Sequence, residues 1–111
     1  MNINPKVISA LASLNLPVVP DEYTGADTEY ITFNYVIEDP LLYADGADQA
    51  EETIFRVNYF TKDDPQATKK LIRKLLRSAG FTIVDTTELF ETDTKYHHII
   101  VECSIDGLVD D

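Results

Sequence analysis

The residues best suited to chemistry are the carboxylates of one acidic segment around Gly46, namely Asp45, Asp48, Glu51 and Glu52. Carboxylates around a glycine turn are typical Ca²⁺ ligands. In the only EF-hand register that places Gly46 at the turn and Glu52 last, Leu41 and Tyr43 fall at the first two ligand positions. Neither can supply a carboxylate there, so the motif fails. We predict no metal site; a looser cation site is the alternative to a loop that is solvated or orders against a partner.

Histidine and cysteine, the other residue types suited to chemistry, occur as His97, His98 and Cys103. Adjacent strand residues point to opposite faces, so the two histidines cannot easily bind one metal ion. Two histidines and one cysteine are also too few for a usual zinc site. Cys103 alternates with Val101 and Ile105, which is typical of a small buried core residue. We therefore predict no cofactor.

Motifs that would indicate catalysis are missing from the sequence. It contains no Ser-centred nucleophile elbow and no dinucleotide fingerprint, and the four glycines are isolated. A catalytic cysteine would need a histidine base and an orienting group. The sequence therefore predicts a protein that is not an enzyme.

Charge is strongly segregated along the chain. No lysine or arginine lies between Lys6 and Arg56, and ten acidic residues fill the interval from Asp21 to Glu52. Five of the nine basic residues fall in one helical stretch: Lys69, Lys70, Arg73, Lys74 and Arg77. A basic helix face of this kind is ordinarily a solvated outer face. The alternative is that it contacts the acidic 21–52 region of a neighbouring copy, in a head-to-tail manner that can close into a ring.

Length and composition bound the class of protein. The 111 residues are 44% hydrophobic and 26% charged, which predicts a single domain over 1–111, with 1–3 and 107–111 frayed. A net charge of −11 disfavours binding to nucleic-acid backbone or to an anionic membrane. The single cysteine fits a reducing cytoplasm, and the N-terminus does not resemble a secretory signal.

The elements that must position these residues follow from periodicity. A helix is expected over 5–15 with Asn4 as its cap, and a second runs from Pro65 to a stop at Gly80. Strands are expected at 29–37, 53–60, 81–90 and 95–105, the third with a bulge near Asp85. These elements predict an α+β fold in the order α-β-β-α-β-β. Its four-stranded, mainly antiparallel sheet carries both helices on one face.

Several segments in order resemble a family of small phage proteins: LPVVPDEY, EYITFNYV, YADGADQAEE, FRVNYFTKDD, RSAGF and ELFETDTKYHHIIVEC. This pattern is similar to the tail-completion or tail-terminator proteins, also called minor structural proteins, of long-tailed phages and prophages. The resemblance covers about residues 15–105. It implies a homo-oligomeric, typically hexameric, ring at the head-proximal end of the tail tube, which stops tube growth and joins tail to head. The family has no catalytic residues that could be assigned to positions of this sequence.

The resemblance also implies partners and a location. The partners would be other copies of the chain, the tail tube protein and a head–tail connector protein, while DNA would pass through without specific binding. The protein would reside in the virion tail or neck, and in the host cytoplasm before assembly. Residues 38–52 would form a loop for ring or tube contacts, with an acidic lumen that repels DNA. Alternatives are another head–tail connector, a minor capsid component, or an acidic inhibitor that mimics DNA.

Overall fold

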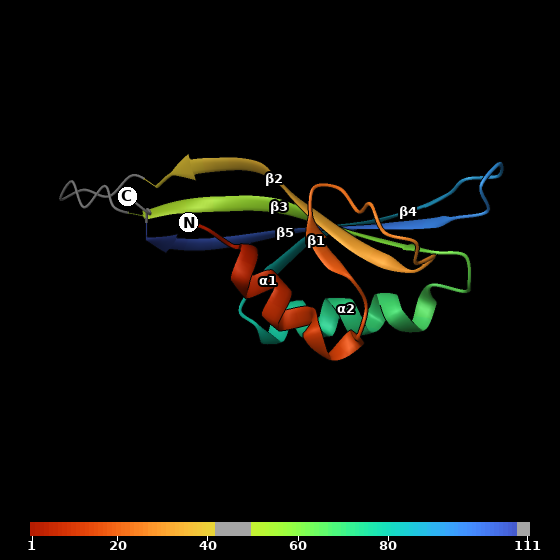
Figure 1. Cartoon of the computed structure of the whole chain (residues 1–111). Helices are drawn as coiled ribbons and strands as arrows, with labels where there is room; N and C mark the ends of the chain where they lie inside the picture. The colour runs from red at the N-terminus through yellow and green to blue at the C-terminus, as the bar shows by residue number, and fades with distance from the viewer. Residues whose placement is uncertain (42–49, 109–111) are drawn as a thin grey trace.

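Two β-hairpins joined side by side form the sheet of this protein. The computed structural model describes residues 1–41 and 50–108. Its elements are α1 (Asn4–Leu11), the 3₁₀ turn η1 (Ala12–Leu14), β1 (Val18–Pro20), β2 (Tyr30–Pro40), β3 (Ala50–Thr61), α2 (Gln66–Ser78), β4 (Thr82–Phe90) and β5 (His97–Leu108). The strand order is β1-β2-β3-β5-β4, and both helices cover one face of the sheet (Figure 1). We call the other side the open face.

The prediction of a four-stranded, mainly antiparallel sheet is wrong. A fifth strand, β1, runs parallel to β2 and pairs with Ile31–Phe33, so the sheet is mixed and the order is α-β-β-β-α-β-β. The three residues Val18–Pro20, which follow Pro17, carry too little periodicity to predict a strand. Proline is tolerated there because β1 is an edge strand. The two helices on one face and the two antiparallel hairpins agree with expectation.

The core lies between the sheet and the helices. Phe55, Val57 and Tyr59 of β3 are fully or almost fully buried, as are Ile99, Val101 and Cys103 of β5, on the faces that alternation predicted. From the helix side the core receives Val7 and Leu11 of α1 and Ile72 and Leu76 of α2. Burial raises the pKa of the Cys103 thiol to about 12, so this cysteine stays protonated and unreactive in the folded chain.

A bulge in β2 moves the side chains that follow it to the opposite face of the sheet from the one that simple alternation gives. The register shifts between Tyr35 and Ile37, so that Ile37 pairs with Ile54 on the open face. Simple alternation would place Ile37 on the same face as Ile31 and Phe33, and the structure contradicts this. An inserted residue changes the side of every later residue, because side chains on a strand alternate with a period of two.

The ends of α2 are set by local hydrogen bonds. At the start, Pro65 is the N-cap and has no side-chain cap hydrogen bond, while Asp64 just before it accepts a hydrogen bond from the Gln66 N–H (3.0 Å). At the other end Gly80 has φ 97°, its N–H donates to Arg77 O (3.0 Å), and Phe81 N–H donates to Leu76 O (3.1 Å). These two bonds form a Schellman motif, which requires a left-handed residue and so favours glycine.

Three smaller predictions are wrong. Helical spacing places Leu71 with Ile72 and Leu75 on the apolar face of α2, but Leu71 is 44% exposed. Asn4 is the first residue of α1 rather than its cap, and its N–H donates to Asn2 Oδ1 (3.0 Å). Ile3, expected to be frayed, is fully buried.

The C-terminal strand is longer than predicted. Gly107 and Leu108, also expected to be frayed, belong to β5 and pair with Glu51 and Ala50. Gly107 lies directly against Met1, since a Cβ there would fall 1.4 Å from Met1 Cε. Residues 109–111 lie outside the described residues.

No helix in the described parts of the chain is long and apolar enough to cross a membrane.

Aromatic rings stack across the open face near the β3–α2 connection. Tyr30 stacks on Tyr23 (centroids 4.5 Å apart) and on Phe60 (4.9 Å), and Phe60 stacks on His98 (4.2 Å). A His98 ring nitrogen also lies 3.1 Å from Asn58 Oδ1. Burial lowers the pKa of His98, and the nearby Glu91 carboxylate opposes this shift in part.

We predict that Phe55→Ala lowers the free energy of unfolding by about 3–5 kcal/mol, because it leaves a cavity in the core. The Phe55 ring is fully buried and packs edge-to-face on Phe81, with the two ring centroids 4.9 Å apart. Phe90→Ala is the matched control: this ring is 50% exposed, and its loss should cost about 1 kcal/mol or less. Urea unfolding followed by circular dichroism measures both. Equal losses would contradict the assigned core.

We also predict that stability falls as the pH drops below about 6.5, the ordinary histidine pKa. Because His98 has a lowered pKa in the folded state, the unfolded chain binds more protons in this window. The contribution of neutral His98 to stability is complete above about pH 6.5, and it is lost as the pH falls toward the pKa of His98 in the folded state. Between about pH 7.5 and about pH 5.5, His98→Gln should therefore lose less unfolding free energy than the parent chain. An identical loss in both would contradict the prediction.

Candidate assembly surfaces

The outer face of α2 is basic, as the sequence predicted. Lys70, Lys74 and Arg77 are exposed, and Lys69 and Arg73 are half-buried. Lys69 differs from the other four, because its ammonium forms an ion pair with Glu88 of β4. This ammonium, and then the Gln66 amide, lower the pKa of Glu88. Lys69 therefore ties α2 to β4, and we name the remaining four, Lys70, Arg73, Lys74 and Arg77, the basic row.

Both ends of the predicted acidic loop over 38–52 are β-structure. β2 runs to Pro40 and β3 begins at Ala50, and the register pairs Glu51 with Pro40 and Glu52 with Asp39. With the end of β5 they form a three-stranded extension, which we call the arm: 37–40, 50–54 and 104–108. The arm projects beyond α1 (Figure 1). Asp45 and Asp48 lie outside the described residues.

Glu51 and Glu52, the two described members of the predicted acidic contact set, lie on opposite faces of the arm. Glu51 lies on the helix side of the arm, where it and Glu38 (Oε2, 3.1 Å) accept hydrogen bonds from the Met1 ammonium. Glu52 lies on the open face, because adjacent strand residues point to opposite sides. Glu51 is thus committed to an intrachain ion pair, and Glu52 belongs to a different surface.

On the open face of the arm three carboxylates lie side by side, one on each strand. Glu52 pairs in register with Asp39 of β2 and with Asp106 of β5. Directly opposed like charges destabilise a sheet. We call Asp39, Glu52 and Asp106 the acidic row. Sequence analysis missed Asp106, although its alternation with Glu102 and Ser104 was a usable signal, because the strand was predicted to end at 105.

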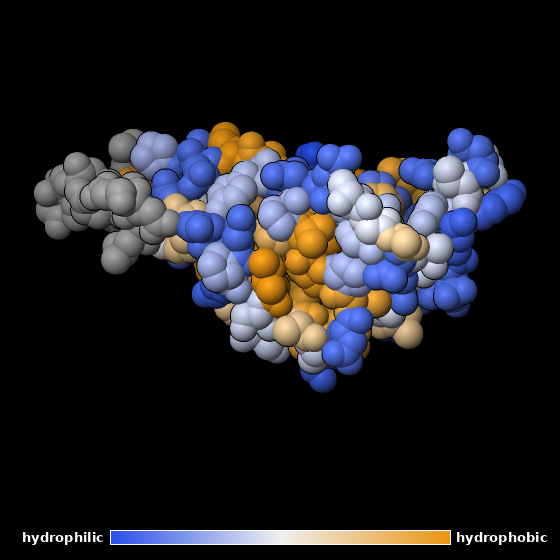
Figure 2. Space-filling view, viewed as in Figure 1, coloured by the Kyte–Doolittle hydropathy of each residue, from blue (hydrophilic) through white to orange (hydrophobic). Residues whose placement is uncertain are grey.

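The two long edges of the sheet carry most of the exposed large hydrophobic residues. Among the described residues eight are exposed, and six of these lie on β2 or β4: Tyr35, Val36, Ile37, Val84, Leu89 and Phe90. Hydrophobic residues reach the surface over β2 in Figure 2. β4 is a terminal strand, and β1 covers β2 only at Ile31–Phe33. Both edges therefore combine apolar side chains with a strand that lacks a neighbour among the described residues.

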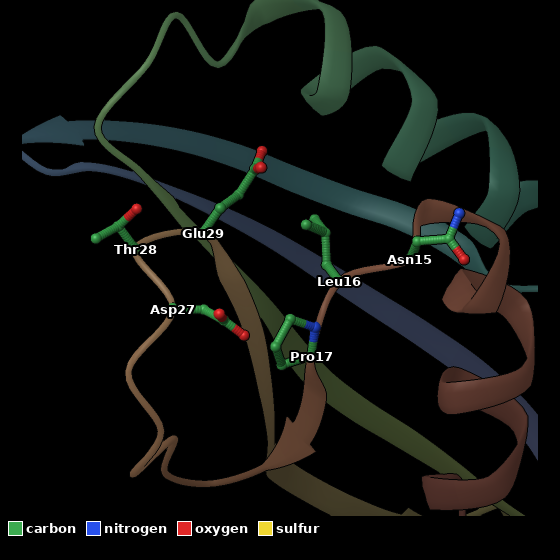
Figure 3. Close-up of a pocket in the computed structure, with 6 residues that line it drawn as sticks. All are labelled: Asn15, Leu16, Pro17, Asp27, Thr28 and Glu29. Carbon is green, nitrogen blue, oxygen red and sulfur yellow. The ribbon is translucent and has the colours of Figure 1, made fainter.

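A hollow beside the β1–β2 connection contains two carboxylates, which already have partners within the chain. It is lined by Asn15, Leu16, Pro17, Asp27, Thr28 and Glu29 (Figure 3). Asp27 accepts a hydrogen bond from the Tyr23 hydroxyl (3.0 Å), and Glu29 accepts one from Tyr59. Burial, and then this bond to Glu29, raise the pKa of Tyr59.

In the described parts of the chain no group of three or more His, Cys, Asp or Glu residues could hold a metal ion.

Comparison with known proteins gives a match in structure. No protein-family model and no curated protein sequence matches the chain. Among solved structures, a chain of the virion of the native gene transfer agent particle is similar, with a TM-score of 0.65 and 12% sequence identity. The match covers 96% of this chain and 91% of that chain. The two chains share a fold over nearly their whole lengths.

We predict that Glu52→Gln raises the free energy of unfolding by about 0.2–1 kcal/mol at low salt, because it removes the central charge of the acidic row. The gain should shrink at about 1 M salt, where charges are screened beyond about 3 Å. Glu102→Gln is the matched control on the same face, since it removes the partner of Arg56 Nε (3.1 Å) and should give no gain. Equal effects of the two substitutions at low salt would contradict repulsion within the row.

Proposed function

We propose that this protein is a structural subunit of a phage-like particle and that it forms the tail-terminator ring at the head-proximal end of the tail tube. The observation that carries the proposal is the shared fold with a chain of a gene transfer agent virion, which extends over 96% of this chain. The ordered segments that resemble tail-completion proteins give independent support from the sequence.

The surfaces suit assembly better than they suit chemistry on a small substrate. The acidic row is unfavourable in an isolated chain, so a stability requirement does not explain it. Exposed apolar side chains that gather in patches often mark interaction sites. A ring subunit needs two different contact surfaces, because a head-to-tail contact joins unlike patches of identical copies. The basic row and the acidic row form such a complementary pair.

In this proposal the partners are other copies of the chain in a hexameric ring, the tail tube protein on one side and a head–tail connector protein on the other. DNA passes through the ring, and carboxylates facing the lumen would repel its phosphates rather than hold them. The protein is then a component of the tail or neck of the particle.

One alternative has the same fold and charge but a different position. A head–tail connector would also join the two parts of the particle, without stopping tube growth. An inhibitor that mimics DNA fits the structure less well, because the basic row on α2 interrupts the negative surface. Such a mimic would bind a basic protein groove and would not belong to a particle.

Deleting the coding sequence from a strain that produces the particles tests this function by electron microscopy of the lysate. We expect tails of uncontrolled length and heads without tails, because nothing then stops tube growth or joins the two parts. Supplying the intact chain in trans should restore joined particles, and antibody-bound gold should label the neck. Detached tails of normal length would indicate the connector instead. Normal particles would contradict both assignments.

A further inference from the structure

We propose that neighbouring copies of this chain join head to tail along their sheet edges, with residues 82–85 of β4 of one copy antiparallel to residues 34–37 of β2 of the next. This inference deepens the proposed function, because it rests on the chain being a ring subunit and names the surfaces that build the ring. The occupant of each edge is therefore a second copy of this chain.

The first argument is the apolar character of the two edges. β2 exposes Tyr35 (37%), Val36 (44%) and Ile37 (42%) next to one another, and β4 exposes Val84 (52%) near its start. A strand edge that carries hydrophobic side chains favours pairing with another strand, which natural monomers usually prevent. Contact between the two edges would bury both sets of side chains at once.

The second argument is strand direction. β2, β3, β5 and β4 alternate in direction across the sheet, since each neighbouring pair is antiparallel. β4 therefore runs opposite to β2. When a second copy is placed beside the first in the same orientation, its β2 lies antiparallel to β4, and the alternation continues. A head-to-tail array of this kind uses the same two edges in every copy and closes if each step adds a rotation.

The third argument is that irregularities on the two edges lie at the same level of the sheet. Tyr35 pairs with Phe55, Phe55 with Cys103, and Cys103 with Ile83. Each edge has its register shift next to this row, one at Val36 and the other at Val84. The bulged valines therefore protrude from opposite edges at adjacent levels. Bulges also limit indiscriminate edge pairing, so a specific neighbour is favoured over random aggregation.

The fourth argument is charge. α2 packs against β4 and is linked to it by the Lys69–Glu88 ion pair, which places the basic row beside the β4 edge. On the opposite edge β2 carries Glu38 on the helix side, where its carboxylate also accepts a hydrogen bond from the Met1 ammonium (3.1 Å), and Asp39 on the open face. Joining the edges brings positive and negative surfaces of different copies together. Such complementarity sets register and the rate of encounter more than it adds affinity.

Cysteine cross-linking tests the proposed contact, because the native Cys103 is buried and the introduced thiols are then the reactive ones. A chain carrying Val36→Cys and Val84→Cys, treated with a short bis-maleimide at high protein concentration, should give a ladder of covalent oligomers. Mixing the two single variants should give dimers only, since each copy then has one reactive edge. Circular dichroism verifies that every variant is folded.

The matched control carries Ile8→Cys and Leu71→Cys, two hydrophobic residues of similar exposure (41% and 44%) on the helices rather than on the sheet edges. We expect about tenfold more oligomer from the edge pair than from this control. Equal yields, or dimers from either single variant alone, would overturn the head-to-tail arrangement.

Charge reversal provides a second test, which leaves the two cysteine positions unchanged. Lys74→Glu with Arg77→Glu, added to the edge-cysteine chain, should reduce the ladder, and adding Glu38→Lys with Asp39→Lys should restore it. A reduction that the second pair fails to reverse would overturn the proposed alignment of the two surfaces.

These results are separable from the test of the proposed function. If deletion abolishes tail joining but the edge cysteines link no better than the control, the function stands and the edge contact is wrong. If the edge cysteines give the ladder while deletion leaves particles normal, the contact stands and the virion role is wrong.

Discussion

The antiparallel pairing of β3 with β5 is the interaction on which the rest of the structure depends. The ladder runs from the Ala50–Leu108 pair to the Thr61–His97 pair, so it joins two hairpins that are separate in sequence into one sheet. Phe55, Val57, Val101 and Cys103 come from these two central strands, and all four are completely buried. Each helix then covers a face that already exists. Without this ladder, the hairpins would expose their apolar sides and α2 would have nothing to pack against.

The same ladder has a cost at one end. Extending β3 and β5 beyond the helices builds the arm, and the regular register then places Glu52 between Asp39 and Asp106. This arrangement opposes folding in an isolated chain, because like charges face one another across neighbouring strands. In the head-to-tail assembly that we propose, the basic surface of a neighbouring copy would offset that repulsion.

Much of the architecture was predictable from local pattern. The amphipathic character of α2 and its stop at Gly80 follow from residue types at short spacing, and the structure confirms them. The buried faces of β3 and β5 follow equally from strict alternation. Of the candidate contact residues, the five basic ones lie on α2 as predicted, although Lys69 is engaged with Glu88. Asp106 was missed because the strand end was misplaced.

The sequence by itself determined the types of the main elements and the segregation of charge along the chain, because helix and strand periods and caps depend on neighbouring residues. Only the tertiary structure decided that Val18–Pro20 joins the sheet, that Ile37 turns to the open face, and that Asp39, Glu52 and Asp106 meet in one row. Each of these outcomes depends on a partner strand distant in sequence. Strand pairing and register are set by such partners and by packing, which no local pattern encodes.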